Sequence, residues 1–392
     1  LSQHTDSTLE FDCIVIGAGI QGSFTAYQLA KRNKKTLLLE QFVLPHTRGS
    51  SHGQTRIIRK AYDQDFYVRM MEECYELWAQ LEKEAGVKLY RQTGLLIMGP
   101  EKSESFQTIK NTLQRNKVPT VVLNRDNFSQ HIPNVNLAEG DGAVVDVTAG
   151  VLYADRALKT AQVQFQKLGG VIRDKEKVTD IKPGPVVKVS TSAGVYTAKS
   201  VVITAGPWAS QLLQHTGLEL PLEVVKINVC YWKEKVPGTY DVKRRFPCFL
   251  LTEGEESSQN IYGLPSNEYP GLMKVCYHDG SKGDPDQRDL QTDRSDIDIL
   301  QRTIARCFPG LLPKPAVVES CLYTLTPDRH FVLDHHPAYS NIVIGAGFSG
   351  HGFKFGPIIG KILCELSLGE VPSYDLSPFQ IKRFQGKTKS AL

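Results

Sequence analysis

The chain has 392 residues, of which 41% are hydrophobic and 22% charged, and its formal net charge at pH 7 is +4. The length predicts two domains, and the proportions of hydrophobic and charged residues are typical of a soluble globular protein. The net charge is small and scattered, so it gives no reason to expect binding to nucleic acid or membranes. No apolar run approaches the ~18 residues that a membrane helix needs. The eight cysteines are widely spaced without a metal-ligand pattern, so we expect reduced thiols and no metal site.

One short apolar segment ending in small residues occurs three times along the chain. Ile-Val-Ile-Gly-Ala-Gly lies at 14–19 and again at 342–347, and Val-Ile-Thr-Ala-Gly ends at Gly206. Each copy is typical of a buried strand whose carboxyl end lets a ligand approach the backbone closely. Because ligands of open α/β sheets lie beyond the carboxyl ends of parallel strands, the three copies predict one cofactor shared by distant segments.

The first copy predicts a dinucleotide-binding unit. The pattern indicates a strand over 12–16, a helix over 21–32 and a second strand over 36–39. Gly17, Gly19 and Gly22 form the GxGxxG pattern, which allows a tight turn, close approach to a pyrophosphate and packing of helix on strand. The helix N-terminus, just after Ile20, favours phosphate charge. Glu40 follows the second strand, where an acid binds a ribose hydroxyl.

Further elements follow in chain order. Apolar residues recur every three or four positions from Phe66 to Leu81, which predicts a helix that ends at Gly86. Short strands and turns are predicted over 87–145, then a helix over 155–168 and a strand that reaches 201–204. The stretch 220–316 is strand-like and turn-rich, with strands over 227–232 and 274–277.

The alternation of these segments predicts two domains that share the chain discontinuously. Residues 1–86, 146–219 and 317–392 are expected to form the nucleotide-binding domain. Residues 87–145 and 220–316 are expected to form a domain of mixed sheet that binds the substrate. The chain therefore passes back and forth between the domains instead of completing one before the other.

The second copy also matches GxGxxG, through Gly345, Gly347 and Gly350. A helix over 356–366 follows it, but no second strand comes before Glu370. The segment is therefore better suited to holding a ring system than a second pyrophosphate. Gly352 belongs to the same loop.

Six motifs in order resemble the monomeric sarcosine oxidase family, and the resemblance spans nearly the whole chain. They are GAGIQG at 17–22, HTRGSSHGQTRIIRKAY at 46–62, TAGPW at 204–208, GLMKVCYH at 271–278, ESCLYTLTPD at 319–328 and GAGFSGHGFKF at 345–355. The resemblance implies a doubly wound, Rossmann-like FAD-binding domain interleaved with a mixed-sheet substrate domain, as in D-amino acid oxidase and glutathione reductase. It also implies a monomer that oxidises secondary amino acids such as sarcosine or L-pipecolate with oxygen, releasing hydrogen peroxide.

The resemblance further implies roles for individual residues. Cys321 matches the cysteine that holds the flavin by an 8α-thioether bond, although a lone cysteine is by itself a small buried hydrophobe. Arg56 lies against the flavin, and Arg59 with Lys354 binds the substrate carboxylate, which a guanidinium and an ammonium can fix by charge and direction. Without the family, both arginines would be interpreted as surface residues. Three positions apart on a strand, Arg56 and Arg59 would lie on opposite faces.

Other matched positions surround the flavin. Lys274 is implied to stand where oxygen is reduced, with Tyr262 and His278 flanking the substrate; the pattern around Lys274 suits a strand. His278 alone would be interpreted as a structural histidine. The cofactor-binding positions implied are Gly17, Gly19, Ile20, Gly22, Glu40, His52, Thr55, Arg56, Gly206, Tyr323, Gly347, Gly350, Gly352 and Lys354. The helix after Lys354 would favour negative charge on the flavin if its N-terminus faced the ring.

Two alternatives remain open at this point. A flavin amine dehydrogenase would share the fold but pass electrons to an acceptor other than oxygen, and a flavin-binding protein without turnover would share the cofactor only. The last three residues, Ser390-Ala391-Leu392, resemble the peroxisomal Ser-Lys-Leu signal with its middle residue changed. They predict a peroxisomal location and an import receptor as partner.

Overall fold

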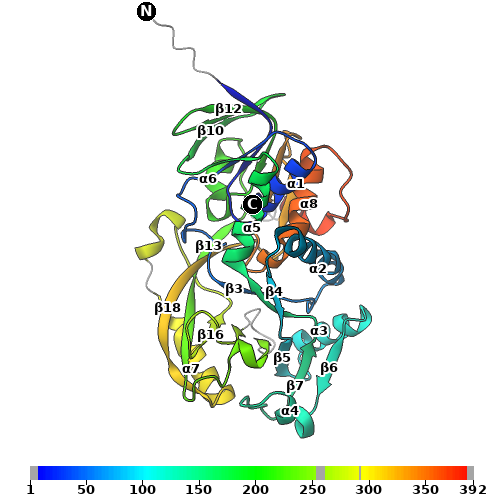
Figure 1. Cartoon of the computed structure of the whole chain (residues 1–392), viewed down its shortest axis with the longest axis vertical. Coiled ribbons are helices and arrows are strands. Elements are labelled where there is room, and N and C mark those ends of the chain that lie inside the picture. Colours follow the sequence, from blue (N-terminus) through cyan, green and yellow to red (C-terminus); the bar gives the residue numbers. More distant parts are fainter. Residues whose placement is uncertain (1–7, 253–260, 291–292, 386–392) are drawn as a thin grey trace, which may run out of the picture. The chain divides into compact units, whose positions relative to one another are not determined.

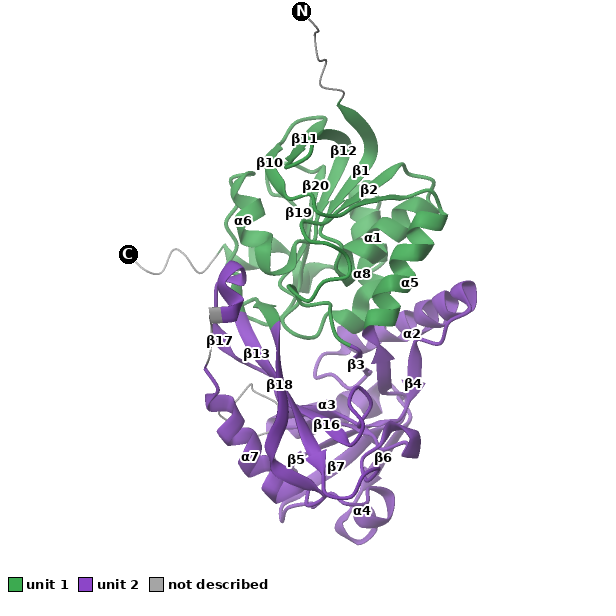
Figure 2. Cartoon of the chain, turned by 60° about the vertical axis from the view of Figure 1, so that its left-hand side comes forward, with its two compact units in different colours: residues 1–53, 155–224, 322–392 green, residues 54–154, 225–321 purple. Residues whose placement is uncertain are grey.

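The computed structural model describes residues 8–252, 261–290 and 293–385. The chain divides into two compact units (Figure 2). The first unit comprises Leu1–Gly53, Asp155–Val224 and Leu322–Leu392, and the second comprises Gln54–Ala154 and Val225–Cys321. The tripeptide Ser390-Ala391-Leu392 lies outside the described residues.

The three repeated apolar segments are neighbouring parallel strands of one sheet in the first unit (Figures 1 and 2). They are β1 (Leu9–Ile16), β12 (Val195–Ile203) and β20 (Ile342–Ala346). Ile203 of β12 lies opposite Ile16 on one side and Ile344 on the other, so the small residues that follow each strand come out at one edge of the sheet. The repeats predict that distant segments meet at one edge of a sheet, where a ligand can bind. The order and direction of these strands meet that requirement.

The remaining strands complete this sheet on both sides. β2 (Thr36–Leu39) and β9 (Val171–Arg173) continue it in parallel beyond β1, and β19 (Val332–His335) pairs antiparallel with β20. β10 (Val178–Lys182) and β11 (Val187–Thr191) form an antiparallel extension on the first half of β12. β2, β20 and the carboxyl-terminal halves of β1 and β12 are entirely buried, as expected for strands covered on both faces.

Four α-helices are described in the first unit. They are α1 (Ile20–Lys31), α5 (Ala154–Lys167), α6 (Ala209–Gln214) and α8 (Gly356–Ser367), with short 3₁₀ turns at Gly206–Trp208, Phe353–Phe355, Ser377–Phe379 and Ile381–Phe384. Three of these helices, α1, α6 and α8, contact strands of this sheet, and α1 and α8 pack on one another. A Cβ atom at Gly360 would lie 2.7 Å from the backbone carbon of Phe24, so this approach requires glycine.

The second unit is built on a mixed, mostly antiparallel sheet. Its strands in spatial order are β17 (Ser281–Lys282), β13 (Glu223–Glu234), β16 (Leu272–Tyr277), β15 (Ile261–Leu264), β14 (Cys248–Leu251), β5 (Leu95–Pro100), β7 (Asp141–Asp146) and β6 (Thr120–Leu123), with β18 (Leu311–Leu325) paired to β13. β14 and β5 run parallel, and the neighbouring pairs described on either side are antiparallel. A small sheet of β3 (Thr55–Ile58), β8 (Gly150–Tyr153) and β4 (Tyr90–Gln92) lies in the same unit.

The helices of the second unit are α2 (Asp65–Ala85), α3 (Glu104–Arg115), α4 (Arg125–His131) and α7 (Ser295–Cys307). Gly86 caps α2 in the left-handed conformation, as the sequence predicted. The other three lie in stretches that were interpreted as strands and turns. In α7 the apolar residues Ile297, Leu300 and Ile304 are buried at helical spacing. This periodicity was present in the sequence but was masked by the turn residues around it.

The unit boundaries differ from those expected from sequence. Residues 54–86 were expected in the nucleotide-binding domain but belong to the second unit. Backbone pairing explains the difference, because β3 pairs along its whole length with β8, from Thr55 opposite Tyr153 to Ile58 opposite Gly150. Residues 146–154 and 317–321 also belong to the second unit, and residues 220–224 to the first.

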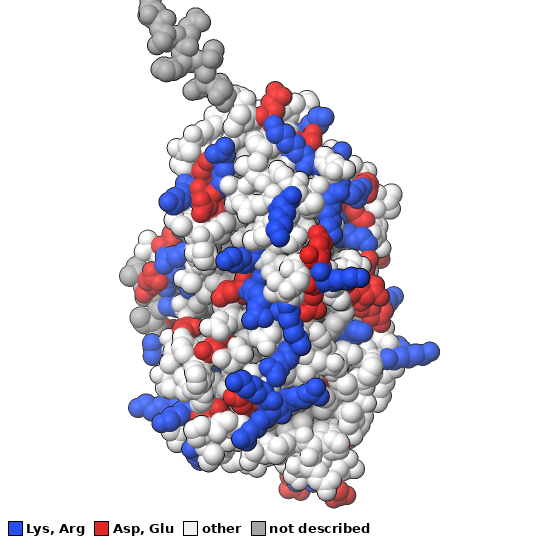
Figure 3. Space-filling model, viewed as in Figure 1, with Lys and Arg blue, Asp and Glu red and all other residues white. Residues whose placement is uncertain are grey.

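The described residues lack three features: a membrane-spanning helix, a metal-binding cluster and a disulfide bond. No helix in the described ranges is long and apolar enough to cross a membrane. The same residues contain no cluster of histidine, cysteine or acidic side chains that could hold a metal ion. None of the eight cysteines, all within the described ranges, forms a disulfide, and all are buried. Basic and acidic side chains are interspersed over the face shown in Figure 3.

Candidate functional site

The first glycine motif forms a tight cradle between β1 and α1. Gly17 has φ +100°, and a Cβ atom on it would lie 2.2 Å from the carbonyl oxygen of Thr204. A Cβ atom on Gly22 would lie 1.8 Å from the carbonyl oxygen of Gly17. Thr204 Oγ1 donates to the carbonyl oxygens of Ile16 at 3.0 Å and Gly17 at 3.2 Å. The turn therefore accepts only glycine at these two positions, and Thr204 holds it in place.

Glu40 lies beside this cradle, at the end of β2. Its side chain is largely buried, and Oε1 accepts a hydrogen bond of 3.1 Å from the backbone N–H of Ala18. Oε2 accepts from the N–H of Phe42 at 3.1 Å and lies 3.4 Å from Nε2 of His46. At the start of α1, the N–H of Ile20 donates to Ser51 Oγ at 3.1 Å. Ser51 lies in a quoted motif, but the sequence analysis assigned it no role.

The second glycine loop joins the first. Gln21 Nε2 donates a hydrogen bond of 2.8 Å to the carbonyl oxygen of Gly352. Gly347 and Gly350 have φ +66° and +80°, and Ser349 between them has φ +53°. Positive φ at a buried serine requires support from its surroundings. The two glycine motifs thus lie next to one another, and their sharing of one cofactor stays a prediction.

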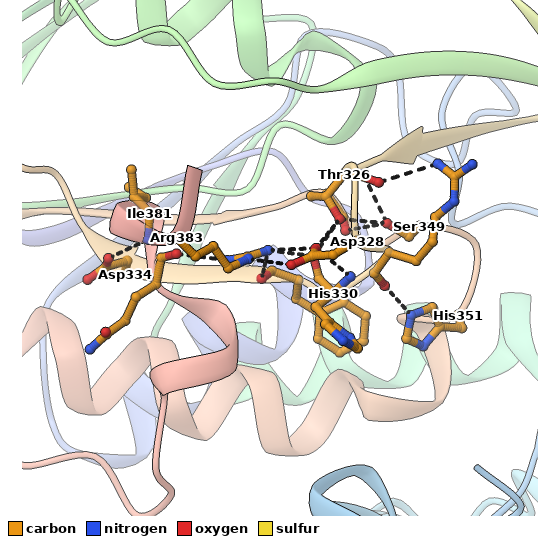
Figure 4. Close-up of polar contacts among 12 residues, drawn as sticks. Thr326, Asp328, His330, Asp334, Ser349, His351, Ile381 and Arg383 are labelled. Atoms are coloured by element: carbon orange, nitrogen blue, oxygen red, sulfur yellow. Dashed lines mark hydrogen bonds and ion pairs between the residues drawn. The ribbon is translucent and has the colours of Figure 1, made fainter. Parts of the chain in front are cut away.

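A polar network supports Ser349 and the loop around it (Figure 4). Ser349 N donates to the carbonyl oxygen of Thr324 at 2.9 Å, and its hydroxyl donates to that of Gly347 at 2.8 Å and accepts from Thr326 N at 3.2 Å. Thr326 Oγ1 donates to the carbonyl oxygen of His330 at 2.7 Å. The loop is therefore attached to the turn that follows β18.

Arg383 fastens this turn from the C-terminal segment (Figure 4). Its Nε donates to Asp328 Oδ2 at 2.9 Å, and Nη2 donates to the carbonyl oxygens of His330 and Phe331, both at 2.9 Å. Burial acts to raise the pKa of Asp328, but the hydrogen bond from Arg383 and the N–H of His330 lower it overall. Asp328 is thus held as a carboxylate by its partners.

These features fit the cofactor FAD. The glycine cradle at the start of α1 suits a pyrophosphate, and Glu40 is in position for a ribose. Two buried polar atoms, Gln21 Oε1 and Thr324 Oγ1, have no hydrogen-bond partner among the described residues. Buried polar atoms are nearly always satisfied, so the orphaned pair is consistent with polar groups supplied by a ligand.

In the second unit the structure brings Thr55, Arg56 and Lys274 together. Lys274 is 6% exposed on β16, and its Nζ donates to the carbonyl oxygen of Thr55 at 3.3 Å. Arg56 Nη1 donates to the same oxygen at 2.9 Å. Nζ of Lys274 also lies 3.9 Å from Oε2 of Glu268, a carboxylate that the sequence analysis missed. Lys274 lies on a strand, as predicted.

Arg59 lies one residue beyond β3, so the expectation of a strand that includes both arginines was wrong. Its guanidinium lies over the ring of Tyr62, 4.0 Å from the centroid, and donates to the carbonyl oxygen of Ala61. Buried Asp146 fixes the segment after Arg59, because its Oδ2 accepts from the N–H groups of Lys60 at 2.8 Å and Ala61 at 3.0 Å. The sequence analysis did not single out Asp146.

The implied substrate residues divide between the units. Tyr262 and His278 are neighbours in the second unit, where their ring centroids lie 5.7 Å apart with an interplanar angle of 85°. Lys354, in the first unit, is 5% exposed and its Nζ donates to the carbonyl oxygen of His351 at 2.9 Å. Arg59 belongs to the second unit, so joint binding of a carboxylate by Arg59 and Lys354 stays a prediction.

Cys321 lies on β18 and is 8% exposed. The residues beside it are held from both sides: Arg288 Nη2 donates to Ser320, at 3.0 Å to the carbonyl and 2.9 Å to the hydroxyl oxygen, and Ser50 Oγ donates to the carbonyl oxygen of Leu322 at 2.5 Å. Tyr323, two residues after Cys321 on the same strand, is buried to the same extent. The remaining implied cofactor residues, His52 and Gly206, lie in the first unit.

Comparison with known proteins agrees with this geometry. The profile of the FAD-dependent oxidoreductase family matches residues 12–366. The chain is 56% identical to human peroxisomal sarcosine oxidase, over 97% of this chain and 98% of that protein. It is 36% identical to monomeric sarcosine oxidase of a Bacillus species, over 95% of this chain and 96% of that protein.

Among solved structures, NikD, an amino acid oxidase essential for nikkomycin biosynthesis, has the same fold, with a TM-score of 0.82 and 24% identity over 95% of this chain and 98% of that one. The chain therefore belongs to the family of FAD-dependent oxidoreductases and, within it, to the sarcosine oxidases.

Proposed function

We propose that this protein is an FAD-dependent oxidase of small secondary amino acids, such as sarcosine or L-pipecolate, that reduces oxygen to hydrogen peroxide. The observation that carries the proposal is the buried ammonium of Lys274, held beside Arg56 through the carbonyl oxygen of Thr55. A buried cation is costly to keep without a partner. It is useful where negative charge develops during a reaction, because a fixed charge stabilises it without reorganisation.

Bound FAD would supply the acceptor for the hydride equivalent taken from the C–H bond next to the amine nitrogen of the substrate, which leaves an imine. The residues of the chain bind and orient the substrate for that transfer. Arg59 and Lys354 each provide a cation for the substrate carboxylate, and the guanidinium adds a directed pair of donors. The rings of Tyr262 and His278, packed edge to face, limit the space around the amine.

Lys274 has a separate task in the oxidation of the reduced cofactor. The transfer of an electron to oxygen creates an anion, and the ammonium of Lys274 stabilises it. Arg56 contributes a second positive charge near the same place, because both side chains donate to one carbonyl oxygen. Discrimination between an oxidase and a dehydrogenase of the same fold therefore depends on Lys274.

We further propose that Cys321 holds the flavin covalently through an 8α-thioether bond. The support is its place on β18 between two anchored neighbours, Ser320 and Leu322, in the motif that resembles the family's attachment sequence. A covalent bond would retain the cofactor and raise its reduction potential, which favours oxidation of an amine.

The location and assembly state are proposed on the relatives. The human and mouse proteins, 56% and 54% identical, are named peroxisomal sarcosine oxidases, and the C-terminal Ser390-Ala391-Leu392 provides a candidate signal for the import receptor. The bacterial relative is named monomeric sarcosine oxidase, which favours a monomer. Peroxide release suits a compartment that degrades it.

The experiment that tests the function is a peroxide-coupled assay of the purified protein with a panel of secondary amino acids. Sarcosine and L-pipecolate should each yield one peroxide per substrate oxidised. Glycine and primary amino acids serve as comparison substrates. Absence of peroxide with every secondary amino acid, while an artificial electron acceptor supports turnover, would identify a dehydrogenase instead.

A further inference from the structure

A buried carboxylate accompanies Lys274 in the second unit. The side chain of Glu268 is 5% exposed and that of Lys274 is 7% exposed, and Nζ lies 3.9 Å from Oε2. Each oxygen of Glu268 also accepts a hydroxyl donor, Oε1 from Thr55 Oγ1 at 2.8 Å and Oε2 from Tyr231 OH at 2.8 Å. Two hydroxyl donors and a nearby ammonium thus converge on this one carboxyl group.

The strands around the pair bring the two residues together. Tyr231 of β13 lies directly opposite Lys274 of β16 in the antiparallel register, and Glu268 lies in the loop that leads into β16. Thr55 begins β3 and contacts both members, through its hydroxyl to Glu268 and its carbonyl oxygen to Lys274. The pair is therefore built by three segments that are distant in sequence.

Among the described residues, the other ionisable groups that act on the pair include Tyr231 and two thiols, and none of these three supplies a second counter-charge to Lys274. Burial, and then the charge of Glu268, raise the pKa of Tyr231, and burial raises the pKa of Cys248 to about 12 and that of Cys276 above its usual value. Glu319 accepts a hydrogen bond from Tyr269, and that bond raises the pKa of the tyrosine. Arg56 carries a positive charge and so cannot balance the ammonium.

We propose that Glu268 is a positioning residue for the oxygen reaction, which keeps Lys274 charged and directed through a buried ion pair. The inference rests on the proposed role of Lys274. Glu268 itself contacts neither substrate nor oxygen in this account. It acts by offsetting the cost of burying an ammonium, through the ion pair between the two side chains.

The first test compares reoxidation of the reduced holoenzyme by oxygen in stopped flow, from about pH 6 to about pH 10. In Glu268→Gln the pH at which the rate falls to half should lie about 1–3 units lower than in the unchanged protein, because an opposite charge at this distance shifts a titration by that amount. Anaerobic reduction by sarcosine should change little. Glu268→Asp, which keeps the charge, should restore most of the original profile.

Glu234 provides a matched control for the same substitution. Its side chain is also buried, at 1% residue exposure, and accepts hydrogen bonds from Tyr240 N at 2.7 Å and Ser266 Oγ at 2.9 Å. It has no ion pair with Lys274. Glu234→Gln should leave the pH profile of reoxidation unchanged, even where it lowers the stability of the protein.

A second test measures the coupling between Glu268 and Lys274 from protein stability, without any enzyme assay. Thermal unfolding of Glu268→Gln, Lys274→Met and the double variant forms a double-mutant cycle. Each single change leaves one buried charge unpaired, so the double variant should unfold at a higher temperature than the sum of the single losses predicts. Purely additive losses would contradict the pair.

The outcomes separate this inference from the proposed function. If Lys274→Met leaves reoxidation unchanged, the role of Lys274 fails and the inference with it. If Lys274→Met slows reoxidation but Glu268→Gln keeps the original pH profile and the cycle is additive, the inference alone is overturned. A shift in Glu234→Gln equal to that in Glu268→Gln would also overturn it.

Discussion

Gln21 Nε2 donates a hydrogen bond of 2.8 Å to the carbonyl oxygen of Gly352, across 331 positions of sequence. The bond joins the start of α1, where the first glycine motif ends, to the loop of the second. Both motifs follow strands of one parallel sheet. The hydrogen bond holds the first glycine loop and the second glycine loop next to one another at the edge of that sheet. Gln21 is buried, and its Oε1 has no hydrogen-bond partner among the described residues.

Gln21→Ala should therefore lower the melting temperature of the holoprotein and its flavin content after purification. Loss of one buried hydrogen bond costs about 0.5–1.5 kcal/mol. Gln107, whose side chain donates to the carbonyl oxygen of Glu101 at 2.5 Å in an exposed position, serves as the control. Equal loss of flavin in Gln21→Ala and Gln107→Ala would contradict a role for Gln21 in the cofactor site.

The contact between Arg383 and Asp328 should make stability depend on pH. The pKa of Asp328 is lowered in the folded protein, so its contribution is present above its unfolded value of about 3.9 and is lost as the pH falls through the lower folded value. Asp328→Asn should destabilise the protein near neutral pH, and the difference from the unchanged protein should close in acid. Denaturant unfolding at a series of pH values measures it, and a difference that stays constant down to acid pH would refute the prediction.

Cys321→Ser should abolish retention of the flavin after acid precipitation. The unchanged protein should give a yellow pellet and the variant a colourless one, because only a covalent bond survives unfolding. Cys364→Ser is the matched control, since burial raises the pKa of this thiol to about 12 and leaves it unreactive. A colourless pellet from the unchanged protein would show that the attachment is absent.

Arg59→Ala should weaken binding of sarcosine by about 1.5–3 kcal/mol, the value of a charge-assisted hydrogen bond. Arg59→Lys should fail to restore binding, because an ammonium lacks the planar pair of donors. An inhibitor without a carboxylate should bind the variants and the unchanged protein alike. Arg69, exposed on α2, provides a control arginine, and equal weakening of both ligands in Arg59→Ala would refute the carboxylate contact.

The glycine turn of the candidate cofactor site could be predicted from the sequence because its signals are local. Gly17 and Gly22 have no space for a side chain, so the GxGxxG spacing reports a steric requirement of the turn itself. The strand assignment of Lys274 was also confirmed, since the run of apolar residues on both sides of it is a local property of the sequence. The three copies of one apolar segment also predicted that β1, β12 and β20 end at the same edge of one sheet.

The missed residues depend on contacts between remote segments. Glu268 accepts a hydrogen bond from Thr55, 213 positions away in the sequence. The residues next to each of them in the sequence give no indication of this contact. Asp146 is the last residue of a strand, and its carboxylate accepts hydrogen bonds from the backbone N–H groups of Lys60 and Ala61. The sequence alone does not show this contact, because it depends on the fold. Sequence patterns report local geometry, whereas these pairs arise from the order of strands in the sheets.

Lys274→Met, followed in stopped flow through both half-reactions, tests the central claim most directly. The account predicts that reduction by sarcosine proceeds at nearly the original rate, while reoxidation by oxygen slows by about 100- to 1000-fold, the cost of losing one preorganised electrostatic group. Methionine keeps an unbranched side chain that is one atom shorter and removes the charge. Equal slowing of reduction and reoxidation, or no slowing of reoxidation, would contradict the assignment of Lys274 to the reaction with oxygen.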